Sequence, residues 1–155
     1  MELSPRQEPT TLDLPYAGFW IRLIAYLLDS LIIFIVSSIP FFFIRLHYLG
    51  GKDELTTELV LNGISVLLGW FYYAGMESSK YQATLGKQMM GIFVTDTGGY
   101  RLSFLHATGR FFAKIPSSLI LLIGFIMAAF TARKQALHDI IAGTLVYRHQ
   151  QDAEV

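Results

Sequence analysis

Residues 18–39 read GFWIRLIAYLLDSLIIFIVSSI, and this stretch decides the class of fold. Its charged residues are Arg22 and Asp29, and the rest is almost entirely apolar. A bilayer core about 30 Å thick is crossed by roughly 20 mostly apolar residues at a helical rise of ~1.5 Å each. Taken from Phe19 to Ile39, the stretch is therefore long enough to form a helix that spans a membrane.

Two further stretches, Leu59–Met76 and Ile115–Ala132, contain no charged residue. Over the 155 residues of the chain 53% are hydrophobic and 15% are charged, whereas about a quarter of the residues of an average soluble protein are charged. This composition disfavours a disordered chain, a nucleic-acid binder and an ordinary soluble enzyme. The sequence predicts an all-α membrane protein in contact with the lipid bilayer, with about three transmembrane or re-entrant helices.

The segment after the second apolar stretch is predicted to form a short β-hairpin at the membrane surface. Ile92–Thr95 is rich in β-branched and aromatic residues, Asp96–Gly99 supplies turn residues, and Tyr100–Leu102 is expected to return as the second strand. Phe104–Lys114 mixes aromatic and basic side chains, which suits a helix lying near the interface.

The ends of the chain are polar, and they set the limits of the membrane domain at residues 16–148. Residues 1–15 are predicted to be a flexible cytoplasmic tail, and residues 149–155 a second polar tail. Just before that second tail, residues 131–143 are expected to contain a short helix that ends at Gly143.

The distribution of Lys and Arg orients the chain through the positive-inside rule. With three full spans, seven basic residues lie on the side of the N-terminus and five lie on the other side. If the third stretch enters and leaves on one side, Arg133, Lys134 and Arg148 move across, and the tally becomes ten against two. Three spans are the simpler arrangement, because a re-entrant hairpin must shield its backbone from lipid. Either topology predicts a cytoplasmic N-terminus.

Asp29 is the charge that most needs an explanation. It lies about 15 Å along the helix from Phe19, near the middle of the bilayer. An ionised carboxylate there costs several kcal/mol unless it faces protein or water. Arg22 lies two turns earlier on nearly the same face, where Gly18 and Ala25 are small enough to let another helix approach.

Arg22 and Asp29 are poorly placed to bond each other, since helical side chains lean toward the N-terminus and the rise between them is about 10 Å. For Arg22, the available acceptors are Asp139 and Glu77. For Asp29, four polar partners are available: Lys87, Asn62, Tyr72 and Tyr73.

Three motifs in order resemble the RDD family of small integral membrane proteins, named for one Arg and two Asp. Residues 18–29 are similar to that family's opening helix, and Thr84-Leu85-Gly86-Lys87 with Gly91 downstream is similar to its middle motif. Residues 133–139, followed by Ala142-Gly143-Thr144, resemble its closing motif. The likeness runs from about residue 16 to residue 148, nearly the whole chain.

This resemblance implies that Arg22, Asp29 and Asp139 are the signature triplet. It also implies an integral protein of a bacterial-type cytoplasmic (inner) membrane, and association of some members with cation/proton exchange. Around the triplet, His138 is expected as a partner of Asp139. The supporting polar residues are expected to be Tyr26, Glu77, Thr84 and Lys87. The structural glycines are expected to be Gly18, Gly86, Gly91 and Gly143.

Two functions are consistent with these features. In the first, Asp29 exchanges a proton for Na⁺ or another small cation, Arg22 tunes its pKa, and Asp139 with His138 gates or relays protons from the cytoplasmic side. Three helices are few to enclose a pathway, so this hypothesis expects a homo-oligomer. In the second, the protein is a non-transporting membrane scaffold or assembly module whose buried charges only specify the fold.

No enzyme activity, cofactor or metal site is predicted. The four His residues lack metal-ligand spacing, and the chain has no Cys to supply a thiolate. The hypotheses therefore concern a membrane protein, not a catalyst.

Overall fold

The computed structural model describes residues 14–48, 54–119 and 123–149. Most of the two predicted tails lies outside these residues. The elements follow in the order α1 (Phe19–Tyr48), α2 (Glu54–Glu77), α3 (Leu85–Met89), β1 (Ile92–Asp96), α4 (Phe104–Leu119), α5 (Ile123–Ile126), the 3₁₀ turn η1 (Met127–Ala129), α6 (Leu137–Ala142) and β2 (Thr144–Arg148).

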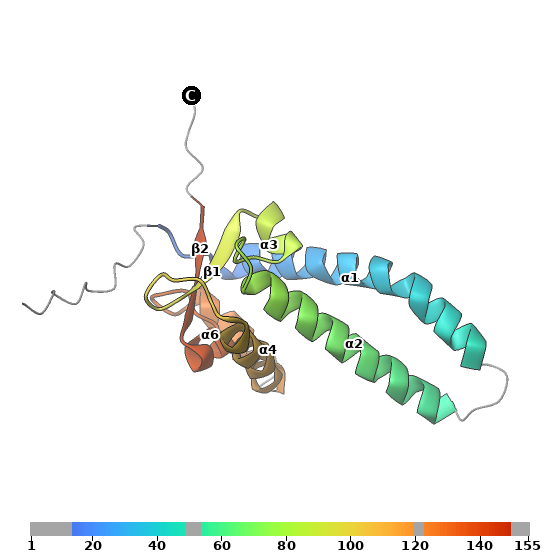
Figure 1. Ribbon diagram of the computed structural model, residues 1–155. Coiled ribbons are helices and arrows are strands. Elements are labelled where there is room, and N and C mark those ends of the chain that lie inside the picture. Colours follow the sequence, from blue (N-terminus) through green and yellow to red (C-terminus); the bar gives the residue numbers. More distant parts are fainter. Residues whose placement is uncertain (1–13, 49–53, 120–122, 150–155) are drawn as a thin grey trace, which may run out of the picture.

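Helices α1 and α2 are long and apolar enough to cross a membrane. They contain 30 and 24 residues, which corresponds to about 45 and 36 Å at a rise of ~1.5 Å per residue. Both extend away from the other elements, which gather around the start of α1 and the end of α2 (Figure 1). Large apolar side chains along them are exposed, for example Phe34 and Val36, each at 70%. Lipid-facing helices have this property, and the first two predicted spans are confirmed as candidate spans.

The third apolar stretch is divided between two elements, so a third span is not confirmed. Helix α4 ends at Leu119, and α5 packs back against it. A Cβ built on Gly124 would lie 3.0 Å from the Cα of Ser117, which shows how closely the two backbones approach. Within the described residues, the two parts of the stretch pack against each other, and a glycine at this contact lets their backbones approach closely.

Helix α4 buries a face that carries a charge and exposes large apolar side chains. Its buried face carries small side chains and Arg110, while Leu105 and Ile115 on the other side are exposed. This is the reverse of a helix on a soluble protein, whose apolar stripe faces the core.

The predicted hairpin is wrong in its second strand, because β1 pairs with β2. The two strands are antiparallel, with Val94 opposite Val146. The turn after β1 does form, and Oδ1 of Asp96 accepts the N–H of Tyr100 at 2.8 Å. The chain then enters α4 after Ser103, whose hydroxyl caps the helix by accepting the N–H of His106. Too few residues remain between the turn and α4 to form a second strand, and β2 occupies the place beside β1 instead.

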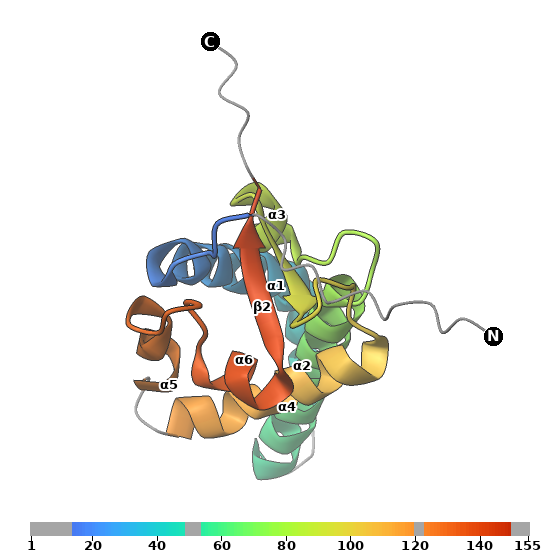
Figure 2. The same ribbon diagram turned by 90° about the vertical axis from the view of Figure 1, so that its left-hand side faces the viewer.

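The N-terminal approach to α1 covers the other side of β2. The N–H of Ala17 donates to the carbonyl of Val146 at 2.8 Å, and Tyr16 forms an isolated bridge with Tyr147. Seen from this end, β2 crosses in front of α1 and α2, with α6, α5 and α4 beside it (Figure 2). The start of α1 and the end of the membrane domain therefore lie together.

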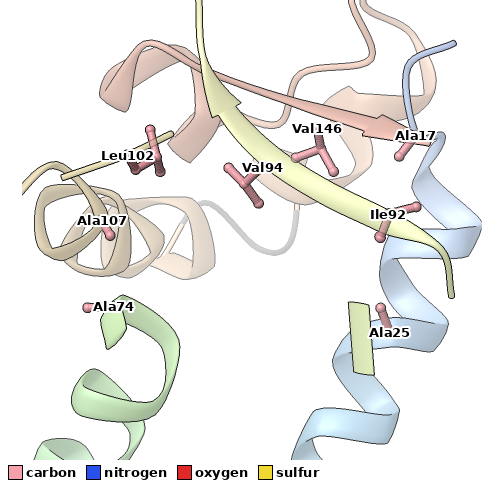
Figure 3. Packing of buried hydrophobic residues seen from close by; sticks show 8 residues of the cluster. All are labelled: Ala17, Ala25, Ala74, Ile92, Val94, Leu102, Ala107 and Val146. Carbon is pink, nitrogen blue, oxygen red and sulfur yellow. The ribbon is translucent and has the colours of Figure 1, made fainter. Parts of the chain in front are cut away.

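The hydrophobic core lies where the helices meet the sheet (Figure 3). Four larger side chains fill it: Ile92, Val94, Leu102 and Val146. The helices contribute small ones: Ala17 and Ala25 before and within α1, Ala74 in α2 and Ala107 in α4. Small residues let helix backbones approach closely, and this brings the polar groups of α1, α2 and α4 within reach of one another.

The strand pairing can be tested by disulfide trapping, because the chain contains no Cys. We expect Val94→Cys with Val146→Cys to cross-link on mild oxidation. The N–H of Val94 points away from β2, to the carbonyl of Gln82, so Val94 and Val146 form a non-hydrogen-bonded pair. Such pairs have Cα atoms about 4.5 Å apart, within the range of a disulfide. Mobility on a non-reducing gel reports the product.

The control pairs Val94→Cys with Arg101→Cys, which lies in the strand expected from the sequence. Efficient cross-linking of the control, with none between positions 94 and 146, would restore the hairpin and contradict the observed sheet.

Candidate functional site

Asp139, at the start of α6, is the acceptor that joins three elements. Its buried carboxylate accepts from Nη1 of Arg22 in α1 through Oδ2, and from Nη2 of Arg110 in α4 through Oδ1 at 2.7 Å. Oδ2 also accepts the N–H of Ala136 at 3.1 Å, which caps the first turn of α6. Of the two acceptors expected for Arg22, Asp139 is the one that it bonds. One carboxylate thus fixes α6 against α1 and α4.

Arg110 extends this cluster to a second carboxylate, Glu77 at the end of α2. Its Nη1 lies 2.7 Å from both Oε1 and Oε2 of Glu77. Lys87, from α3, donates to Oε1 of the same carboxylate at 2.5 Å. The ionic cluster therefore consists of Arg22, Asp139, Arg110, Glu77 and Lys87, and it joins five helices. Arg110 is its centre and is only 2% exposed.

Arg110 is the site residue that sequence reasoning missed, since the sequence placed it only on an interfacial helix. A signal was present: Ala107 and Ala113 lie three residues to either side of it, so Arg110 shares a face with small residues. A basic residue on a small-residue face of an otherwise apolar helix indicates a buried charge with a partner.

Asp139 and His138 each hold one ionisation state near pH 7. Burial alone would raise the pKa of Asp139, but the positive charges of Arg110 and Arg22 hold that pKa well below its usual range. Burial lowers the pKa of His138 to about 3, with the nearby Arg110 and Lys114 acting in the same direction. The imidazole of His138 is therefore neutral near pH 7, which counts against a charge-carrying role there.

Asp29 occupies a separate hydrogen-bonded site and is 1% exposed. Three donors reach its carboxylate: the hydroxyl of Tyr72 at 2.7 Å, the hydroxyl of Thr84 at 2.6 Å and the N–H of Gly86 at 2.7 Å. Of the partners expected from the sequence, Tyr72 is confirmed, whereas Lys87 pairs with Glu77 instead. Among the described residues, no cation lies within ion-pair distance of Asp29.

Gly86 is required at this site because α3 approaches the backbone of α1. A Cβ on Gly86 would lie 2.2 Å from the carbonyl oxygen of Ala25 and 2.9 Å from Oδ1 of Asp29. Thr84, the residue that caps α3, donates to the same carboxylate. The middle motif thus docks on α1 through Asp29.

The other predicted glycines have different surroundings. Gly91 and Gly143 adopt positive φ values of 63° and 59°, and Gly143 ends α6 in the left-handed conformation expected of a helix C-cap. Gly18 makes no close backbone approach: a Cβ there would meet only the Lys134 side chain, at 3.9 Å.

A cavity of about 400 Å³ lies between the ionic cluster and the Asp29 site. Both Arg22 and Asp29 line it, as do Tyr26 from α1 and His138 from α6. Its wall also includes Lys114, whose ammonium nitrogen lies 4.0 Å from the centre of the Tyr73 ring. The described residues contain no group of His, Asp and Glu side chains that would hold a metal ion.

Comparison with known proteins identifies the family. The model of the RDD family matches residues 16–143, which include Arg22, Asp29 and Asp139. The chain belongs to the RDD family. Its apolar, exposed α1 and α2 are therefore transmembrane helices of a membrane protein.

Three proteins of Bacillus subtilis (strain 168) are similar to this RDD chain. The uncharacterized protein YxaI is 40% identical, over 84% of this chain and 95% of YxaI. The uncharacterized membrane protein YteJ is 29% identical, over 94% and 88%. The uncharacterized protein YckC is 33% identical, over 84% and 83%. No solved structure matches the chain.

Replacing Asp139 tests the ionic cluster. We expect Asp139→Asn to lower the free energy of unfolding by about 3 kcal/mol, because breaking a buried ion pair leaves uncompensated charge on Arg22 and Arg110. Chemical denaturation in detergent micelles measures the change.

The matched control is Glu58→Gln, which removes the exposed ion pair with Arg45 at 3.0 Å. Its cost should stay below about 1 kcal/mol. Equal effects of the two substitutions would contradict a structural role for the buried cluster.

Replacing Gly86 tests the docking of α3 on α1. We expect Gly86→Ala to destabilise the protein by about 2 kcal/mol, because the added methyl group overlaps a backbone carbonyl that does not move easily. Gly63→Ala in α2 is the control, since a Cβ there meets no atom within 4 Å. That substitution should be neutral or stabilising by up to about 1 kcal/mol. A neutral Gly86→Ala would show that the close approach is absent.

Proposed function

We propose that this RDD protein is a non-transporting, non-enzymatic membrane scaffold whose buried charges hold a compact domain at one end of two transmembrane helices. The observation that carries the proposal is the state of Asp29. Three donors occupy its two carboxylate oxygens, and a carboxylate offers about four lone-pair positions. One position is left, whereas a hard cation takes about six oxygen ligands, so a closely coordinated cation would have to displace bonds that dock α3 on α1.

Asp139 supports the same function. Its oxygens accept from Arg22, Arg110 and the backbone of Ala136, and its pKa lies far below neutral. A group that stays ionised throughout the physiological pH range does not carry protons. In a scaffold, by contrast, these bonds act as fixed points between helices.

The faces that a scaffold would present to other membrane components are the exposed sides of α1 and α2. Phe42 and Leu46 near the end of α1, and Leu55 and Leu59 near the start of α2, are all more than half exposed. In a bilayer such surfaces contact lipid or the helices of other proteins. The scaffold function uses them without any pathway through the molecule.

We also infer that the N-terminus lies in the cytoplasm. The carbonyl of Lys134 accepts from Arg22, and β2 pairs with β1, which brings the C-terminal basic residues to the side of the N-terminus. Counted in this way, ten Lys and Arg residues lie on that side and two on the other, and the positive-inside rule makes the richer side cytoplasmic.

One observation favours cation/proton exchange as the second candidate. Asp29 lines the cavity, and no cation among the described residues pairs with it. Its carboxylate is held by uncharged donors alone. Intramembrane carboxylates often mark ion pathways. In that mechanism Asp29 would release its proton to the cavity and receive a cation such as Na⁺ in its place.

Flux measurements distinguish the two functions. Purified full-length protein is reconstituted in proteoliposomes, and cation-driven proton flux is compared between wild type and Asp29→Asn. The scaffold predicts no flux above protein-free liposomes in either sample. Wild-type flux that Asp29→Asn abolishes would overturn the scaffold and establish exchange.

Asp96→Asn serves as the control for that outcome, because Asp96 lies in the β1 turn, away from the cavity. Circular dichroism of each variant confirms that it is folded. Flux retained by Asp96→Asn would tie any loss to position 29.

A further inference from the structure

Lys114 is a cation of the cavity wall that the proposed scaffold does not use. The other three cations of the wall have anionic partners. Arg22 bonds to Asp139, Lys87 bonds to Glu77, and Arg110 bonds to the carboxylates of both acids. Among the described residues, Lys114 makes no ion pair, and its ammonium group lies over the Tyr73 ring. Its charge faces a space that an anion can enter.

The charge around the cavity favours an anionic occupant. The ionic cluster holds three cations and two carboxylates, so it carries an excess of positive charge before Lys114 is counted. Asp29 is the remaining acid in the wall. Its oxygens accept from Tyr72, Thr84 and Gly86, so these donors partly neutralise its field before it reaches the cavity.

The depth of the cavity indicates that its occupant comes from the bilayer. Phe19 and Asp29 both line it, so it extends over about 15 Å of a transmembrane helix. The rest of its wall is mainly apolar and includes Leu23, Ile126 and Ala128. On the outside, Ile115 of α4 is exposed. An occupant that matches both parts of the wall has an anionic head and an apolar chain.

We propose that the cavity binds an anionic phospholipid, with the ammonium group of Lys114 holding the headgroup phosphate and the apolar wall receiving the start of an acyl chain. A volume of about 400 Å³ is within the range of ligand-binding pockets and accepts this part of a lipid, but not a whole one. Basic pockets between membrane helices on the cytoplasmic side commonly bind such headgroups. This inference goes beyond the scaffold function and does not depend on it.

The ionisation of Lys114 adds a pH dependence. Burial lowers the pKa of Lys114 to about 7, so the ammonium form is complete only below that pH and a bound phosphate stabilises it. Affinity for the lipid should therefore fall as the pH rises through about 7. The titratable and charged groups that face Lys114 from the packed elements are Tyr73 and Glu77 of α2, Lys87 of α3, Arg110 of α4, and His138 and Asp139 of α6.

The test uses the full-length protein in a zwitterionic detergent. A short-chain phosphatidylglycerol is titrated by isothermal titration calorimetry at a pH of about 6, and phosphatidylcholine with the same chains and inorganic phosphate are titrated in parallel. We expect one phosphatidylglycerol per chain, and affinities at least about tenfold lower for the other two ligands. Equal binding of phosphatidylcholine would contradict the proposed selectivity for an anionic headgroup. Equal binding of inorganic phosphate would contradict the proposed contribution of the acyl chain.

Two variants act on different parts of the cavity. Lys114→Met keeps the apolar stem and removes the charge, and it should weaken phosphatidylglycerol binding about tenfold. Ala128→Leu leaves every charge in place and fills the apolar wall, and it should also weaken binding. Lys80→Met, at an exposed lysine outside the cavity wall, is the control and should bind as the wild type does.

Thermal melting checks that each variant is folded. Wild-type affinity in folded Lys114→Met would overturn the proposal. If a variant does not fold, the comparison of the three ligands on the wild type still decides the outcome. Loss of flux is not a readout here, so failure of lipid binding is distinguishable from failure of the scaffold function.

Discussion

The rest of the structure depends on Arg110, whose Nη1 donates to both carboxylate oxygens of Glu77 while Nη2 donates to Asp139. Arg110 is almost completely buried, and without its two carboxylates it would be an uncompensated charge in an apolar environment. Such a charge costs several kcal/mol, so α4 can pack only where both acceptors are present. Glu77 and Asp139 lie 62 positions apart in the chain, and one guanidinium therefore fixes the end of α2 and the start of α6 together.

This constraint explains why the domain is built with its polarity reversed. In water, helices associate because apolar faces leave the solvent, but in a bilayer lipid tails are as apolar as the helices. Here the buried side of α4 carries Arg110 and alanines, while Leu105 and Ile115 face outward. Ionic and hydrogen bonds decide which faces meet, and alanines let them meet closely.

The sequence predicted the two spans and the short helix before Gly143, and it narrowed the acceptors of Arg22 to Asp139 and Glu77, because each depends on local composition or on few available partners. It did not predict the pairing of β1 with β2. A turn such as residues 96–99 favours a hairpin locally, and only the return of the chain after the third stretch makes β2 available. Arg110 was missed for a related reason: the alanines beside it mark a buried face, but its partners come from α2 and α6, and no local pattern identifies them.

Asp29 and Asp139 are the two acids of the signature triplet, but their surroundings differ in physical character. Asp139 is neutralised by two guanidinium groups, so its carboxylate is an integral part of an ionic lattice. Asp29 is held by two hydroxyls and one N–H, so it depends on short hydrogen bonds alone. The cavity lies between the two. The ionic cluster borders it on one side, and Asp29 with its uncharged donors borders it on the other. The ion pairs and hydrogen bonds on both sides of the cavity hold the helices together without Lys114. The ammonium group of Lys114 lines the cavity without an ion pair among the described residues, and this is why we assign it to a ligand.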